Sequence, residues 1–156
     1  MKILVVSDTH RQMDKMRMAV SLEQPDMVLH LGDHDSDAVE LAREMPNLPI
    51  CYVQGNCDRL LSHGASTYLR KIGGVQIFAV HGHQYDVKNG LLRLRYAAME
   101  HGAQIALFGH THRAYCENLD GLWLMNPGAC GGYRATYGII EIQSGRINCQ
   151  ITEGSL

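Results

Sequence analysis

MKILVVSDTH, residues 1–10, is the stretch that decides the fold. Its apolar run, Lys2–Val6, ends abruptly in the polar cluster Ser7-Asp8-Thr9-His10. A short run that is apolar throughout predicts a strand buried on both faces, as in the parallel sheet of an α/β fold. Open parallel sheets bind their ligands beyond the carboxyl ends of the strands, so the cluster from Ser7 to His10 is a candidate site.

The same arrangement recurs twice further along the chain. A predicted strand at residues 27–31 runs into Gly32-Asp33, and another at residues 50–53 runs into Gly55-Asn56-Cys57-Asp58. Predicted helices at residues 13–22 and 37–45 connect these strands, and a proline follows each helix. The first third of the chain therefore predicts a β-α-β-α-β unit whose three polar clusters converge at one edge of a sheet.

The second half of the chain contains hairpins around a further α/β segment. Strands Thr67–Ile72 and Val75–Val80 flank Gly73-Gly74, and turns at Asp120-Gly121 and Ser144-Gly145 predict two more hairpins. His81-Gly82-His83 follows the first hairpin, a helix is predicted at residues 90–101, and a strand at residues 105–108 leads into Gly109-His110-Thr111-His112. Because no linker or repeat interrupts the pattern, we expect one mixed α/β domain over residues 1–156.

Composition narrows the class of protein. The chain is 46% hydrophobic and 19% charged, as in globular proteins, which excludes a disordered chain. A net charge of -2 excludes a global basic field, so we expect neither an extended nucleic-acid groove nor a membrane partner. The five cysteines are scattered, and the first apolar run is too short for a signal peptide, so we expect reduced thiols and a cytoplasmic location. A homodimer is the commonest symmetric assembly, but no feature of the sequence marks its interface.

The polar clusters carry side chains that bind metal ions. Asp8 and His10 are two residues apart, so on an extended backbone they face the same side, as two ligands of one ion require. His110 and His112 have the same spacing, and Asp33 offers two oxygens that suit a carboxylate shared between two ions. Imidazole with carboxylate indicates a borderline divalent ion, with manganese, iron, cobalt, nickel and zinc as candidates, rather than an all-oxygen calcium or magnesium site.

The five clusters, in order, match D-x-H, G-D, G-N-[H/C], H-G and G-H-x-H. This pattern resembles the calcineurin-like metallophosphoesterase superfamily, and the later Asn126-Pro127-Gly128 resembles a further block of that family. The short length and the Gly-Asn-Cys-Asp variant are similar to the small bacterial and archaeal phosphodiesterases. The resemblance implies an α/β fold in which a two-sheet β-sandwich of mixed sheets is flanked by helices.

The resemblance also implies a dinuclear metal site and a small phosphodiester substrate. One ion would be bound by Asp8, His10, Asp33 and His112, and the second by Asp33, Asn56, His81 and His110, with Asp33 shared. Manganese is the first expectation for both ions. A hydroxide that bridges them would attack phosphorus, because the metals lower the pKa of the water.

Two further residues are candidates on the substrate side of the site. Cys57 stands where many relatives have a histidine that helps the leaving group depart, and a thiol is a poor general acid for an alkoxide. We therefore expect better activity on diesters with good leaving groups than on unactivated monoesters. For His83, contact with the phosphate and a place behind the ligands are both open.

Other polar residues are weighed against structural explanations. His34 and Asp35 are interpreted equally as supports for the ligands or as solvated loop residues. We expect His30 to be a core residue with its hydrogen bonds satisfied, and Arg11 to be a solvated charge. His63 and His101 are expected at the surface.

An alternative from another class is a protein-interaction scaffold. Some members of the superfamily, the retromer-type subunit among them, keep the fold but serve as binding modules with weakened metal sites. A scaffold is expected to have lost ligand positions, whereas all seven ligand residues are present in this sequence. The completeness of the set favours a phosphoric ester hydrolase.

Overall fold

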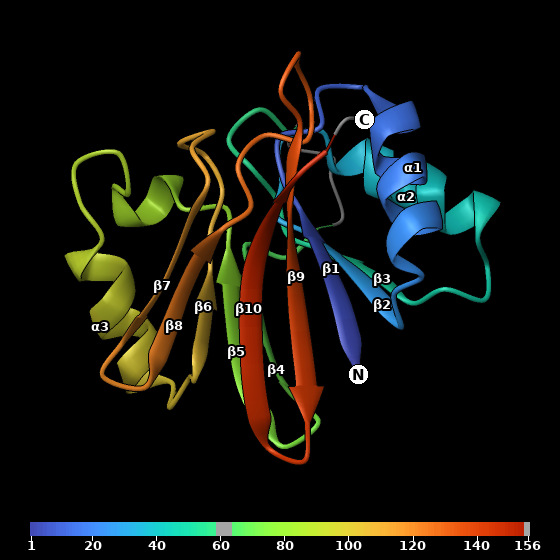
Figure 1. Ribbon diagram of the computed structural model, residues 1–156. Helices are drawn as coiled ribbons and strands as arrows, with labels where there is room; N and C mark the ends of the chain where they lie inside the picture. Colours follow the sequence, from blue (N-terminus) through green and yellow to red (C-terminus); the bar gives the residue numbers. More distant parts are fainter. Residues whose placement is uncertain (59–63, 155–156) are drawn as a thin grey trace.

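The apolar runs form two mixed sheets in the computed structural model, which describes residues 1–58 and 64–154 (Figure 1). Each sheet has five strands. In spatial order, the first contains β10 (Arg146–Glu153), β9 (Thr136–Gln143), β1 (Lys2–Val6), β2 (Met27–His30) and β3 (Ile50–Tyr52). The second contains β4 (Thr67–Ile72), β5 (Val75–Val80), β6 (Ile105–Leu107), β8 (Leu122–Asn126) and β7 (Tyr115–Leu119).

The two sheets pack face to face, and helices cover their outer faces. Ile3 and Val5 of β1 contribute to the apolar core that both sheets share, whereas Leu4 and Val6 point to the opposite face, as side chains alternate along a strand. That outer face is covered by α1 (Met13–Glu23) and α2 (Asp35–Glu44). On the other side of the molecule, α3 (Leu92–Glu100) packs on the second sheet (Figure 1). The predicted sandwich of two mixed sheets flanked by helices is confirmed.

The three predicted hairpins join β4 to β5, β7 to β8 and β9 to β10. In each turn both central residues have a positive φ, for example 57° at Gly73 and 87° at Gly74. Turns of this kind match the twist of the strands they connect. Because they require a positive φ, they favour glycine, and the glycine in each turn predicted the hairpin from the sequence.

Parallel pairing directs the polar clusters to one edge of the sandwich. β1, β2 and β3 are parallel neighbours, and so are β5, β6 and β8. Their carboxyl ends lie at the upper edge in Figure 1, opposite the amino terminus of β1. A short 3-10 helix, η1 (His83–Tyr85), follows the carboxyl end of β5 at that edge. No helix within residues 1–58 and 64–154 has the length and apolarity needed to cross a membrane.

Candidate metal centre

The clusters that follow β1, β2, β5 and β6 meet at this edge. Their side chains form two compact groups in which one donor atom of each residue lies within 4.8 Å of the others. The first group is Asp8, His10 and His112, and the second is Asp8, Asp33 and His81. Asp8 is common to both groups, whereas the sequence resemblance gave the shared position to Asp33.

Asp8 has one oxygen held by the protein and one left for a ligand. Its side chain is fully buried, and Oδ2 accepts hydrogen bonds from Ser7 Oγ at 2.7 Å and from the His110 amide at 3.3 Å. Oδ1 accepts no hydrogen bond from any described residue and lies 3.1 Å from His112 Nε2. A buried carboxylate oxygen without a partner is costly, so a bound cation fits this position.

His81 presents a lone pair to two oxygens. Its Nδ1 lies 2.7 Å from the carbonyl oxygen of Leu31, which only accepts, so Nδ1 carries the proton. In the neutral ring Nε2 is then an acceptor, yet it faces Asn56 Oδ1 at 3.1 Å and Asp33 Oδ1 at 3.5 Å. Three acceptors that point at one another fit a metal ion between them, and the carbonyl behind His81 is the support that metal-bound histidines have. The donor set therefore fits divalent ions.

Asp33 and His110 complete the inner rim. Asp33 is 3% exposed, and its Oδ1 accepts the Cys57 amide at 2.8 Å. Burial opposes its charge, but the hydrogen bonds from Cys57 and the nearby imidazoles prevail and lower the pKa of Asp33. The His110 ring centre lies 5.1 Å from that of His81, and burial, together with the charges of His81 and Lys88, lowers the pKa of His110. Both groups are thus held in the forms that bind metals.

Five of the seven predicted ligands have a left-handed backbone. The φ angles are 53° at Asp8, 47° at His10, 56° at Asp33, 66° at His110 and 57° at His112. The expectation that Asp8 and His10 share a side because the backbone is extended is therefore wrong. They meet because the chain leaves β1 in tight turns, a conformation uncommon for residues other than glycine and concentrated at functional sites.

Asp58 clamps two of the ligand loops together, a role that no local sequence pattern indicates. Its carboxylate accepts four backbone N–H groups: those of Asp33 at 3.1 Å, His34 at 2.7 Å, Asp35 at 2.9 Å and Gly55 at 2.6 Å. Three of these amides lie at the amino end of α2, where a negative charge is favourable. This contact explains why α2 begins at Asp35, two residues before the predicted start.

A buried polar chain supports the turn that carries His10. The Thr9 hydroxyl donates to Asp37 Oδ2 at 2.6 Å and lies 3.0 Å from His30 Nε2, while the amide of Gly32 donates to His30 Nδ1 at 3.1 Å. Because Nδ1 accepts, the proton of the neutral ring is on Nε2 and is donated to Thr9. His30 is fully buried, which lowers its pKa to about 4. Its predicted place in the core is confirmed.

Asn126 supports the loop that carries His110 and His112. It is fully buried, and its amide donates to the carbonyl oxygen of Gly109 at 2.8 Å and to Thr111 Oγ1 at 3.0 Å. Its own oxygen accepts the amide of Gly128 at 2.9 Å. The sequence marked Asn126-Pro127-Gly128 as a block but gave it no role, because this role depends on a loop that precedes it in the chain.

The remaining candidates differ in their exposure and contacts. The Cys57 residue as a whole is exposed. Partial burial of its thiol, together with the nearby Asp33 carboxylate, raises the pKa of that thiol. His83 lies with its ring centre 5.5 Å from that of His81, and its buried Nδ1 has no partner among the described residues. Asp35 is buried, whereas Arg11 and His101 are exposed. His63 lies outside the described residues.

Comparisons with known proteins show the family of this chain. A family model described as the calcineurin-like phosphoesterase superfamily domain matches residues 1–145. A probable metallophosphoesterase of Mycoplasma pneumoniae is 30% identical over 94% of this chain and 93% of its own length. A phosphodiesterase of Methanocaldococcus jannaschii is 28% identical over 92% of this chain and 94% of its own length.

Solved structures share the fold. A predicted phosphoesterase of Streptococcus pneumoniae superposes with a TM-score of 0.82 at 24% identity, covering 97% of this chain and 88% of its own. Vps29 of Entamoeba histolytica, solved in complex with zinc, gives a TM-score of 0.76 at 22% identity, with 98% and 99% covered. At these identities the likeness concerns the fold alone.

Proposed function

Because the chain belongs to the calcineurin-like phosphoesterase superfamily, we propose that it is a phosphodiesterase that uses two divalent metal ions. The observation that carries the proposal is the orphaned Oδ1 of Asp8, buried beside His112 and shared by both groups of potential ligands. The phosphodiesterase name of the relative from Methanocaldococcus jannaschii supports the choice of reaction.

We assign the ligands as the family pattern implies. Asp8, His10 and His112 would hold one ion and Asn56, His81 and His110 the other, with Asp33 between them. Bound there, the ions would supply a water of lowered pKa as the nucleophile and positive charge opposite the phosphoryl oxygens. The inclusion of Asp8 with Asp33 and His81 in one compact group supports two adjacent ion positions. We expect manganese, and iron, cobalt, nickel or zinc suit the same donors.

The protein itself contributes rigidity. The Asp58 clamp, the Thr9–His30–Asp37 chain and Asn126 hold the ligand loops through hydrogen bonds to their backbone and side chains. Such supports keep ligands in place before the metal arrives, so less ordering is needed on binding. They favour an enzyme over a scaffold, because all seven proposed ligands are present and the loops that carry them are held in place.

The substrate is proposed to be a small diester with a good leaving group. A raised thiol pKa makes Cys57 a still weaker proton donor than an ordinary cysteine at neutral pH. His83 is the only other predicted candidate on this side of the site, and it remains a proposal for contact with the phosphate. The five free cysteines in the structure support the proposed cytoplasmic location.

The test combines metal analysis with turnover. Purified protein is stripped with a chelator, reloaded with manganese, and assayed for bound metal and for hydrolysis of bis(4-nitrophenyl) phosphate. We expect two ions per chain and activity that depends on them. His112→Gln should reduce both, whereas His101→Gln, at an exposed position outside the centre, should change neither. Bound metal without turnover of any diester, across the five candidate ions, would favour the scaffold.

A further inference from the structure

A pocket of about 560 Å³ adjoins the candidate metal centre. It is lined by the segment that follows η1 and by the loop that carries His110 and His112: Val87, Lys88, Leu91, Phe108, Thr111, Arg113, Ala114 and Tyr115. Its volume lies within the ~300–1,000 Å³ range of small-molecule sites. None of the residues proposed as metal ligands lines it, so its chemistry is separate from theirs.

The pocket and the centre share a wall. A Cβ placed on Gly82, between His81 and His83, would meet Val87 Cγ2 at 2.8 Å and Phe108 Cβ at 3.6 Å. Thr111, which lies between His110 and His112 in the chain, is fixed by Asn126. The pocket therefore lies directly beside the loops that carry the proposed ligands, so a group bound in it would be next to a phosphate held at the centre.

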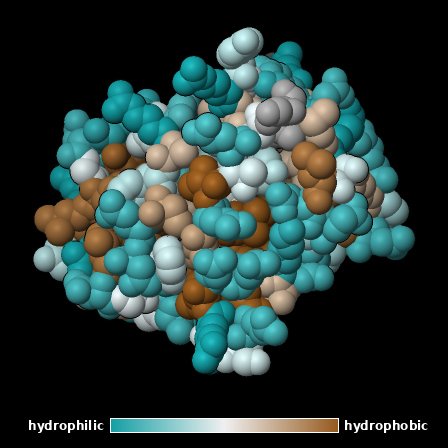
Figure 2. Space-filling model, in the orientation of Figure 1, coloured by the Kyte–Doolittle hydropathy of each residue, from teal (hydrophilic) through white to brown (hydrophobic). Residues whose placement is uncertain are grey.

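The floor of the pocket is apolar and aromatic. Val87 and Phe108 are buried, and the rings of Phe108 and Tyr115 lie with their centres 6.2 Å apart. The Tyr115 hydroxyl donates to Glu117 at 2.8 Å, so the ring rather than the hydroxyl is free to contact a ligand. Such a floor suits an aryl group, which stacks edge to face or offset on aromatic side chains. Figure 2 shows apolar residues at the left of the molecule, over α3, and others in the middle of the view.

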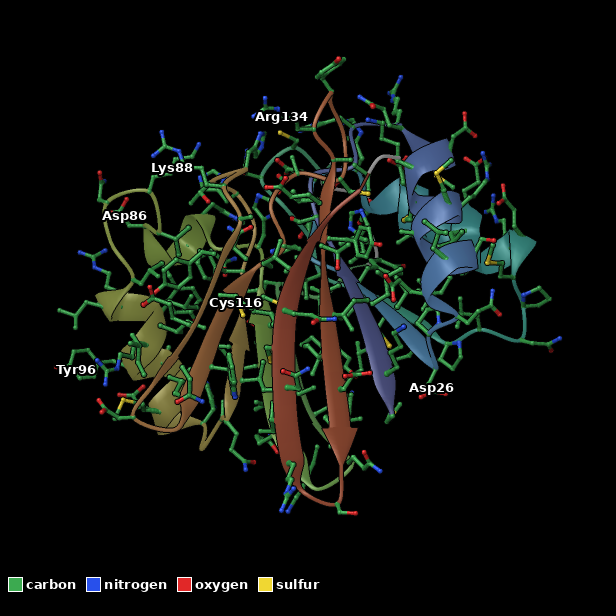
Figure 3. All side chains as sticks on the ribbon, in the orientation of Figure 1. Asp26, Asp86, Lys88, Tyr96, Cys116 and Arg134 are labelled. Carbon is green, nitrogen blue, oxygen red and sulfur yellow. The ribbon has the colours of Figure 1, made fainter. Side chains whose placement is uncertain are left out.

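Two cations stand at the rim. Lys88 and Arg113 are exposed, and neither side chain has an ion pair or hydrogen bond with any residue that the structure describes. No carboxylate lines the pocket, and nearby Asp86 accepts a hydrogen bond from the Asn89 amide instead. Figure 3 shows Lys88 at the upper edge of the molecule, near the carboxyl ends of the strands. Lys88 also influences His110 electrostatically, which places its charge near the centre.

We propose that this pocket binds the second ester group of the phosphodiester and prefers an aryl group that carries its own negative charge. The aryl ring would lie on Val87, Phe108 and Tyr115, and its anionic substituent would face Lys88 and Arg113. This inference rests on the proposed function for the position of the phosphate. It assigns the substrate's specificity to residues that hold no metal.

The experiment compares three diesters that release the same 4-nitrophenolate and differ only in the second ester group: methyl, phenyl and 4-carboxyphenyl. For the manganese-loaded wild type, kcat/KM should rise in that order. In the double variant Lys88→Gln and Arg113→Gln, the ratio of the 4-carboxyphenyl to the methyl ester should fall about tenfold. Arg93→Gln, an exposed residue of α3 outside the pocket, removes a positive charge elsewhere and should leave that ratio unchanged. A ratio in the double variant within twofold of wild type would overturn the proposal.

Direct binding separates this inference from the proposed function. The affinity of the manganese-loaded protein for 4-carboxyphenyl methylphosphonate is measured by calorimetry for wild type and the double variant. Binding about tenfold weaker in the variant supports the pocket even if no diester is hydrolysed, in which case the proposed reaction fails alone. Equal affinity in the two proteins, or no binding to wild type, overturns the pocket whatever the outcome for turnover.

Discussion

Asp8 Oδ1 lies 3.1 Å from His112 Nε2 and accepts no hydrogen bond from the described residues. The other oxygen of Asp8 is fully used, by Ser7 and by the amide of His110. The first and last predicted ligands, Asp8 and His112, thus lie side by side. The two oxygens of Asp8 have different roles: Oδ2 joins the two loops by hydrogen bonds, and Oδ1 is available to a cation.

Asp8→Asn should separate these two tasks. The amide oxygen still accepts from Ser7, while the negative charge that favours a cation is lost. We expect manganese affinity to fall at least ~100-fold, the upper end of the range seen when only a supporting residue is changed. Calorimetry on chelator-treated protein measures this affinity.

The stability of the metal-free protein gives the control for that variant. Because the charge is buried and Oδ1 has no hydrogen-bond partner among the described residues, its removal should leave the melting temperature of metal-free Asp8→Asn equal to wild type or higher. The rise in melting temperature that manganese gives the wild type should disappear. A large drop in the melting temperature without metal would show that Asp8 is structural and contradict the division of its two oxygens.

Asp58→Ala should destabilise the protein because it leaves the amides of Asp33, His34, Asp35 and Gly55 without their acceptor. We expect a loss of about 2–4 kcal/mol in the free energy of unfolding, since the site is half-buried and water replaces part of the loss. Urea unfolding of metal-free protein measures it. Asp86→Asn changes an exposed carboxylate that accepts one side-chain hydrogen bond, from Asn89, and asparagine tolerates the left-handed backbone there, so its effect should stay within about 0.5 kcal/mol. Equal effects of the two variants would refute the clamp.

The sequence predicted those parts of the fold that depend on local chemistry. The strands Thr67–Ile72 and Val75–Val80 have the predicted bounds because their apolar residues and the Gly73-Gly74 turn between them all lie within one short segment. Parallel strands that end in polar clusters predicted the edge at which the candidate site lies. The order of β8 and β7 in the second sheet had no local signal, because it depends on which strand edge remains open after β6 has paired.

What the sequence missed in the site depends on contacts between distant segments. Asp58 and Asn126 both belong to the sequence motifs, but their roles depend on hydrogen bonds to amides and carbonyls of other loops. The left-handed backbone at Asp8 and His10 was missed for the same reason, since a local pattern favours an extended chain after a strand. The hydrogen bonds from Thr9 to Asp37 and from the His110 amide to Asp8 stabilise that conformation instead.

Cys57→His should broaden the proposed activity toward monoesters. A histidine with an ordinary pKa near ~6.5 protonates an alkoxide leaving group at neutral pH far better than this thiol. We expect the turnover of an alkyl phosphate, relative to that of bis(4-nitrophenyl) phosphate, to rise at least about tenfold, below the ~10²–10⁴-fold that a fully positioned acid gives. Cys57→Ser, which adds no acid, should not raise this ratio. If wild type already hydrolyses the alkyl monoester as fast as the diester, the reasoning about the missing acid is wrong.

His30 should make the stability of the metal-free protein depend on pH. Burial lowers its pKa to about 4 in the folded protein, whereas an unfolded histidine titrates near ~6.5. Between these values the unfolded chain binds more protons, so the free energy of unfolding falls as the pH drops from 6.5 toward 4 and levels off below. The loss attributable to His30 should approach roughly 3 kcal/mol, since each unit of pKa is worth about 1.4 kcal/mol.

In His30→Gln, which keeps a polar side chain but cannot titrate, this part of the slope should vanish. The variant should therefore be less stable than wild type at pH 7.5, because the Thr9 and Gly32 contacts are altered, and the difference should shrink or reverse at pH 4.5. Urea midpoints at the two pH values, with chelator present, decide the matter: an unchanged difference between the proteins would mean that His30 does not stay neutral in the fold.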